Sequence, residues 1–262
     1  MSTYIDFRTI AEEALASCPF TNLYLLLDQS GLPDLHSKLS KSSSVWGALF
    51  DHTLDANASV VGPILISAGS KGNLQISRRF GEWLGRSGTY NSTVIMMLSP
   101  LDFEPLMARL VVRLDVTLSE GLDAMLRFFD PRILESMTKF LNAEQSNHFF
   151  SPAESWGYID RAGALIWFKS DFSGNENFSP PLTLSQQQES DLLDASEVDQ
   201  VLDLLRSNLP TTLARLPQEE QYGFAYRKIE EARQRGFTSI SKLALYTATS
   251  LIEQENLVED PS

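Results

Sequence analysis

The residues of this 262-residue chain that could do chemistry are few and scattered. Asp28, which ends the apolar run "NLYLLLD" (22–28), and Asp51 could line a cleft in which two carboxylates hydrolyse a glycosidic bond. Alternatively, Asp28 caps a turn, as a carboxylate at the end of a strand commonly does. His52 lies near Asp51 and Asp55 and could join them in a metal or acid–base cluster, although such a group is typical of a surface loop.

No known catalytic motif supports the carboxylate pair. The sequence has no nucleophile elbow, phosphate-binding Walker loop, dinucleotide-binding glycine loop, zinc-binding His-Glu-x-x-His or Cys-x-x-Cys. Cys18 is the single cysteine, so no disulfide can form within the chain, which fits a reducing cytosol. We therefore expect no catalytic residue, no metal and no cofactor, with a hydrolase using Asp28 and Asp51 as an alternative.

The stretch "LRFFDPRILESM" (126–137) predicts a strand that continues directly into a helix. Asp130 is a favourable N-cap because its carboxylate can accept from the free amides of the first turn. Pro131 suits the first helical position, where a missing N–H has no intrahelical partner to lose. We predict a strand over residues 124–130 and a helix that begins after Asp130.

Two arginines, Arg127 and Arg132, flank this junction and allow two interpretations. In the first, they brace Asp130 or neighbouring carboxylates and so hold the corner between strand and helix. In the second, one arginine projects outward and pairs with a carboxylate or carbonyl of a partner protein.

Strands and helices alternate up to about residue 170, which predicts a mixed α/β lobe. Residues 171–184 are rich in Ser, Asn, Gly and Pro, and predict a linker. Residues 185–262 predict an all-helical lobe that opens with a capping box formed by Ser185 and Gln188. The predicted fold class is therefore α/β, with an α/β domain at 1–170 followed by a smaller helical lobe at 185–262.

Composition limits the partners of the protein. The net charge of −13 repels phosphate backbones, so nucleic acid is not an expected partner. The sequence has no run of roughly 18 uncharged apolar residues, so we expect no membrane span. The first residues lack the basic start and the uninterrupted apolar core of a secretory signal.

The order of several segments resembles one protein family. "LYLLLDQS", "GPILI", "SPLDFEPLMARLVVRLDV" and above all "RFFDPRIL" (127–134) are similar to the effector-chaperone or adaptor family of bacterial type VI secretion, of the Tap/Tec type. The domain that this family shares was long classed as being of unknown function, and the resemblance covers roughly residues 22–150. The chain differs by having Phe129 where Tyr is common, and Gln29 and Ser30 where small residues are common.

The resemblance implies a cytoplasmic, non-enzymatic protein of a Gram-negative bacterium. Such a protein binds a toxic effector, at its N-terminal segment, and promotes its loading on the spike-tip (VgrG-type) protein. The effector segment would add to an edge strand or lie in a groove between the lobes. A structural component of the secretion apparatus is a further alternative. The candidate partner-binding residues are Arg127, Asp130, Arg132, Tyr24 and Asp28.

Overall fold

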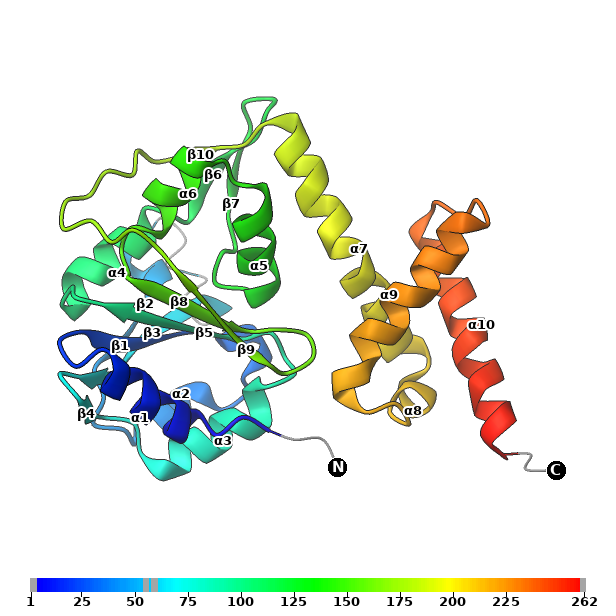
Figure 1. Ribbon diagram of the computed structural model, residues 1–262, viewed down its shortest axis with the longest axis horizontal. Helices are drawn as coiled ribbons and strands as arrows, with labels where there is room; N and C mark the ends of the chain where they lie inside the picture. The colour runs from blue at the N-terminus through cyan, green and yellow to red at the C-terminus, as the bar shows by residue number, and fades with distance from the viewer. Residues whose placement is uncertain (1–3, 54–56, 58–60, 260–262) are drawn as a thin grey trace. The chain divides into compact units, whose positions relative to one another are not determined.

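The computed structural model describes residues 4–53, 57 and 61–259, and it divides into two compact units (Figure 1). The first unit, Tyr4–Leu192, is a mixed α/β fold, and the second begins at Leu193 and is helical. The predicted fold class, an α/β lobe followed by a smaller all-helical lobe, is therefore confirmed.

The α/β unit contains a seven-stranded sheet in which all neighbouring strands are antiparallel. The strand order is β2-β3-β1-β5-β8-β9, and β4 pairs separately with β3. These strands are β1 (Asn22–Asp28), β2 (Trp46–Ala48), β3 (Pro63–Ser70), β4 (Asn73–Leu74), β5 (Val94–Ser99), β8 (Ser155–Ile159) and β9 (Leu165–Lys169).

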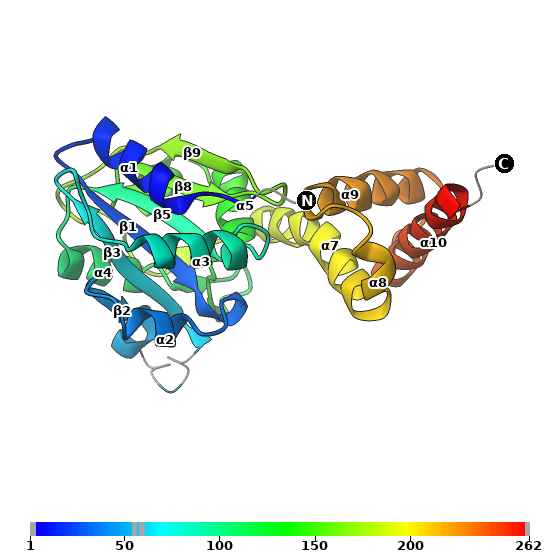
Figure 2. The same ribbon diagram turned by 90° about the horizontal axis from the view of Figure 1, so that it is seen from below.

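Helices cover both faces of this sheet (Figures 1 and 2). One face carries α1 (Phe7–Ser17), α2 (Leu35–Leu39) and α3 (Arg78–Gly88). The other carries α4 (Phe103–Val111), α5 (Pro131–Phe140) and α6 (Ala143–Phe150). Two short 3-10 helices, η1 (Gln29–Gly31) and η2 (Leu49–His52), follow β1 and β2.

The central strand β1 shows why its sequence is apolar throughout. Every residue of β1 is buried, because helices pack against both faces of the sheet. Leu23, Leu25 and Leu27 join the core beside α1–α3, whereas Tyr24 and Leu26 join the core beside α4–α6. A short, mostly apolar run such as "NLYLLLD" predicts a strand covered on both faces, and the structure confirms it.

A second, three-stranded sheet consists of β6 (Asp115–Thr117), β7 (Asp123–Met125) and β10 (Leu182–Thr183). The strand predicted over residues 124–130 is wrong beyond Met125. Phe128 and Phe129 are both buried in the same core, whereas adjacent strand residues would point to opposite faces. The chain therefore turns here, with the Asp130 N–H donating to the Arg127 carbonyl at 2.9 Å.

Residues 171–184 pack on the α/β unit rather than connecting two lobes freely. Phe178 is 7% exposed within the core beside α4–α6, and Glu176 forms an ion pair with Arg113. The strand β10 pairs in parallel with β6. The boundary between the units falls after Leu192, inside α7 (Gln186–Asn208), and not in the segment whose composition predicts a linker.

The helical unit has a hydrophobic core of its own, formed by the end of α7, α8 (Pro210–Leu213), α9 (Gln218–Gln234) and α10 (Ile240–Glu259). At the start of α7, the predicted capping box is confirmed. The Ser185 N–H donates to Gln188 Oε1 at 3.0 Å, and the Gln188 N–H donates to Ser185 Oγ at 3.3 Å.

Candidate partner-binding site

The end of β1 meets the turn before α5 at an ion pair between Asp28 and Arg127. Arg127 Nη2 donates to Asp28 Oδ2 at 2.8 Å, and the Asp28 side chain is 4% exposed. Asp28 Oδ1 accepts from the Ser30 N–H at 2.9 Å and from Ser30 Oγ at 2.6 Å, which makes Asp28 the N-cap of η1. Asp28 is therefore a turn cap, the second of the two roles that its sequence position allowed.

Asp130 and Arg132 form the other half of this corner. Asp130 Oδ1 accepts from the Arg132 N–H at 2.9 Å and caps α5, with Pro131 at the first helical position as predicted. The Arg132 guanidinium also contacts the same carboxylate, with Nη2 2.7 Å from Oδ2 and Nε 3.0 Å from Oδ1. Each arginine thus braces a carboxylate of the chain, although Arg127 braces Asp28 and not Asp130.

Tyr24 lies in the core at the middle of β1. Its ring is 2% exposed and packs 6.3 Å from the ring of Phe103, and its hydroxyl donates to the Leu101 carbonyl at 2.8 Å. Burial, with a smaller contribution from the charge of Asp102, raises the pKa of Tyr24 to about 12. Tyr24 therefore lies inside the core and contacts Leu101 and Phe103 of the chain itself.

The five candidate residues thus differ in accessibility. Tyr24, Asp28 and Asp130 are buried, whereas the side chains of Arg127 and Arg132 are 52% and 32% exposed. The arginines are therefore the members of the set that present atoms to solvent.

The second carboxylate of the hydrolase hypothesis, Asp51, is exposed in η2 next to His52, which is also exposed. Asp55, the third member of the possible cluster, lies outside the described residues. Among the residues that the structure describes, no group of three or more His, Cys, Asp or Glu side chains is placed to hold a metal ion.

A buried ion pair between Arg113 and Glu176 was not predicted. Arg113 is fully buried just after α4, and its Nη1 and Nη2 each donate to a carboxylate oxygen of Glu176 at 2.9 Å. Its guanidinium lies 4.5 Å from the centroid of the Phe178 ring. The remaining donors reach the carbonyls of Arg109, His148 and Phe149 and the hydroxyl of Ser151. The pair fastens residues 171–184 to the α/β unit.

The pKa values reflect this burial. Desolvation lowers the pKa of Arg113, although arginine stays protonated in proteins. Desolvation acts to raise the pKa of Glu176, but hydrogen bonds from Arg113 and from the Phe178 N–H outweigh it, and the pKa falls below its ordinary 4.5. In the sequence, this ion pair is indicated only by an arginine inside the apolar run "LVVRLDV". Its partner, Glu176, is 63 residues away.

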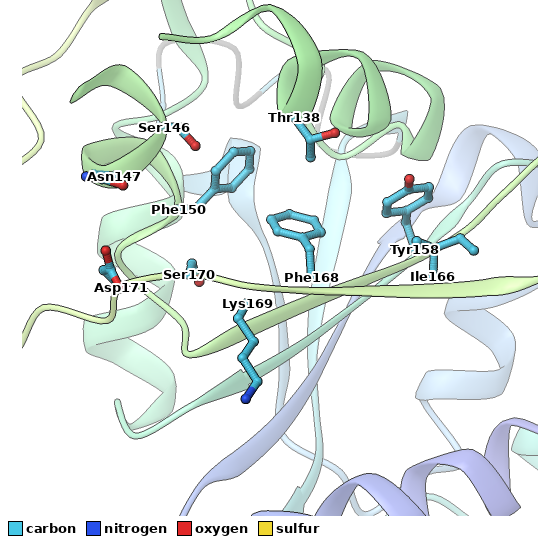
Figure 3. A pocket seen from close by; sticks show the side chains of 10 residues that line it. All are labelled: Thr138, Ser146, Asn147, Phe150, Tyr158, Ile166, Phe168, Lys169, Ser170 and Asp171. Atoms are coloured by element: carbon cyan, nitrogen blue, oxygen red, sulfur yellow. The ribbon is translucent and has the colours of Figure 1, made fainter. Parts of the chain in front are cut away.

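Two pockets flank β9, one on each face. The α6-side pocket has a volume of about 480 Å³ and lies among α5, α6, β8 and β9 (Figure 3). Figure 3 shows Phe150, Phe168 and Tyr158 at its centre, with Lys169 pointing to the opposite side of β9 from Phe168. Its lining residues are Thr138, Ser146, Asn147, Phe150, Tyr158, Ile166, Phe168, Lys169, Ser170 and Asp171.

The α1-side pocket has a volume of about 530 Å³ and is mainly apolar. Its lining residues are Ile10, Glu13, Ala14, Ser17, Cys18, Leu98, Ser155, Leu165, Trp167, Phe168 and Lys169. Neither pocket was predicted, because each is assembled from segments that are far apart in the sequence.

A part of the first unit matches a known family model. Residues 23–148 match the model of a domain of unknown function, DUF4123. This match runs from β1 into α6 and includes the corner formed by Asp28, Arg127, Asp130 and Arg132. Neither curated proteins nor solved structures gave a match to the chain. No helix in the described part of the chain has the length and apolar character needed to cross a membrane.

Proposed function

We propose that the protein is a type VI secretion adaptor or chaperone. It binds a cognate toxic effector, at the effector's N-terminal segment, and promotes loading of that effector on the spike-tip protein. It acts in the cytoplasm of a Gram-negative bacterium, without cofactor, and makes or breaks no covalent bond.

The DUF4123 match is the observation that carries this proposal, because it contains the string "RFFDPRIL" (127–134) on which the resemblance to the adaptor family depends. The described geometry gives that string a physical role: Arg127 holds the end of β1 and Arg132 the start of α5. A rigid corner of this kind suits a scaffold that presents a binding surface.

The hydrolase hypothesis finds less support in the geometry. A general acid or base needs a carboxylate that can reach a substrate, with a pKa tuned to its task. Asp28 is 3% exposed, and Arg127 and Ser30 already donate three hydrogen bonds to its carboxylate. The adaptor proposal explains Asp28 as a structural cap and requires no catalytic role for Asp51.

The proposal is tested by co-purification. We expect the gene to lie beside genes for a toxin and a spike-tip protein, and the tagged full chain, produced with both, to retain the toxin in a defined stoichiometry. Deleting the gene should prevent secretion of that toxin, while the finished apparatus should contain none of the adaptor. A chain that retains no toxin, or that is a stoichiometric part of the finished apparatus, contradicts the proposal.

A further inference from the structure

We infer that β9 is the docking strand of the protein, and that an extended segment of the bound partner adds to it as a further strand. This inference rests on the proposed function, because it identifies the partner segment with a segment of the effector. β9 is the last strand of its sheet, and within the described residues no other strand pairs with its outer side (Figure 2).

The hydrogen bonds at the two ends of the β8–β9 ladder determine which backbone groups of β9 are free. The Ser170 N–H donates to the Glu154 carbonyl at 3.0 Å, and the Asp160 N–H donates to the Ala164 carbonyl at 2.8 Å. In an antiparallel ladder, hydrogen-bonded pairs alternate with pairs that are not hydrogen-bonded. The even-numbered residues of β9 therefore bond to β8, and the odd-numbered residues do not.

The odd-numbered residues Leu165, Trp167 and Lys169 consequently direct their N–H and C=O groups away from β8. No other hydrogen bond to these backbone groups occurs within the described residues. A strand that added here would find a donor and an acceptor at each of these three positions, which is the main source of affinity in strand addition.

The side chains of β9 alternate between the two pockets in the same way. Leu165 and Trp167 line the α1-side pocket, whereas Ile166 lines the α6-side pocket. Ile166 and Trp167 are 38% and 36% exposed, so apolar surface lies on both faces of the free edge. The side chains of an added strand would alternate too, and each set would lie over one pocket.

The opposite edge of the sheet, formed by β2, is less suited to pairing with an added strand. β2 contains only three residues, Trp46–Ala48, and passes directly into η2. Proteins commonly protect an exposed edge with short strands, prolines, bulges or charges. β9 has five residues, no proline and no bulge, and Lys169 is its single charged residue.

The lining of the pockets indicates the chemistry of the added segment. Side chains over the α1-side pocket would meet Ile10, Ala14 and Trp167, so they should be apolar. Side chains over the α6-side pocket would meet hydroxyl and amide groups beside aromatic rings, so small polar residues suit that face.

Charge favours a foreign segment over a second copy of the chain. Two exposed carboxylates, Glu13 and Asp171, lie at the rims of the pockets without an ion-pair partner in the described residues, and they complement a segment flanked by Lys or Arg. A second copy would bring another net charge of −13 to the edge, which opposes association. The occupant is therefore an alternating apolar and polar segment with basic flanks, belonging to another protein.

The test uses the full chain and a fluorescent peptide, Lys-Val-Thr-Val-Thr-Val-Thr-Val-Lys, acetylated and amidated at its ends. Lys169→Pro removes an outward N–H while leaving the β8 ladder intact, and Lys169→Ala is the matched control that keeps the N–H. We expect the proline variant to weaken peptide binding about tenfold and the alanine variant to change it less than about twofold.

Hydrogen exchange gives a second measurement that does not depend on a folded variant. Adding the peptide to the wild-type chain should protect the amides of Leu165, Trp167 and Lys169. Absence of that protection, undetectable peptide binding, or equal binding by the proline and wild-type chains overturns the inference. A wild-type dimer in sedimentation that Lys169→Pro converts to monomer also overturns it, because the occupant would then be a second copy.

Capture of the co-produced toxin separates this inference from the proposed function. If both the wild-type and the Lys169→Pro chains capture the toxin equally, the docking strand is wrong and the adaptor function stands. If the wild-type chain captures no toxin, the adaptor function fails, while the peptide measurements still decide whether β9 accepts a strand.

Discussion

Replacing Glu176 with glutamine tests whether the buried ion pair fastens residues 171–184 to the α/β unit. The substitution keeps the shape of the side chain but removes the charge that compensates Arg113. Because Arg113 is fully buried, its guanidinium would then lack a counter-ion in the core. We expect the α/β unit to lose stability.

The magnitude follows from the geometry. Removing one partner of a buried ion pair costs about 3–5 kcal/mol, whereas an exposed pair contributes about 0–1 kcal/mol. The Glu176 side chain is 31% exposed, and Arg113 keeps its hydrogen bonds to three carbonyls and one hydroxyl. We therefore expect the Glu176→Gln variant to lose about 2–3 kcal/mol, near or below the lower end of the buried range.

Urea unfolding followed by tryptophan fluorescence measures this loss selectively. All four tryptophans, Trp46, Trp83, Trp156 and Trp167, lie in the α/β unit, so their emission reports that unit and not the helical one. Glu12→Gln is the matched control, because Glu12 forms a salt bridge with Arg8 but its side chain is 52% exposed. The control should change the free energy of unfolding by less than about 0.5 kcal/mol.

The pH dependence of stability gives a further check on the same pair. The pKa of Glu176 is lower in the folded protein than its ordinary 4.5, so its contribution is present above about pH 4.5 and is lost as the pH falls through the folded value. The Glu176→Gln variant should lack this part of the acid-induced loss. Unfolding free energies of variant and wild type within about 0.5 kcal/mol of each other at neutral pH would refute the reasoning.

Two further substitutions test the corner, and a third tests the buried Tyr24. Asp130→Ala should lower the free energy of unfolding by about 1–2 kcal/mol, because it removes the N-cap of α5, and it should weaken capture of the toxin. Arg127→Ala removes the ion pair with Asp28, but the Arg127 side chain is 52% exposed and Asp28 keeps its two hydrogen bonds from Ser30, so we expect a loss of about 1 kcal/mol and weaker toxin capture. Folded variants with wild-type capture would contradict both predictions. The pKa of Tyr24 is raised to about 12, so stability should hold below its unfolded value of 10 and decline as the pH rises towards 12. Tyr24→Phe should reduce that decline without abolishing it, because Tyr158 has a similarly raised pKa; an unchanged alkaline unfolding curve would contradict the prediction.

Elements that local sequence specifies were predicted, and elements that depend on distant partners were not. The cap of α5 by Asp130 and the strand conformation of β1 follow from residues within a few positions of each other. By contrast, "LRFF" has the composition of a strand, but Phe128 and Phe129 enter one core together and force a turn. That outcome depends on α6, whose Phe149 packs 5.5 Å from Phe128.

The candidate site shows the same contrast between features that local sequence specifies and features that depend on distant residues. The bracing role of Arg127 and Arg132 could be anticipated from a carboxylate flanked by arginines, but the pairing of Arg127 with Asp28 joins positions 99 residues apart. Residues 171–184 have the composition of a linker, but Glu176, Phe178 and the pairing of β10 with β6 hold them on the α/β unit. Average composition does not reveal single anchoring contacts.

The docking strand is the feature that sequence alone is least able to identify. The residues "LIWFK" of β9 are as apolar as those of β1, yet β1 is fully buried and β9 is at the edge. Their difference comes from topology, because β9 is the second strand of the last hairpin in the sheet and no later strand among the described residues covers it. An exposed apolar edge promotes aggregation, so proteins usually remove one unless a partner covers it. The proposed adaptor function provides such a partner, and this is why we assign the edge to partner binding rather than to incomplete folding of the sheet.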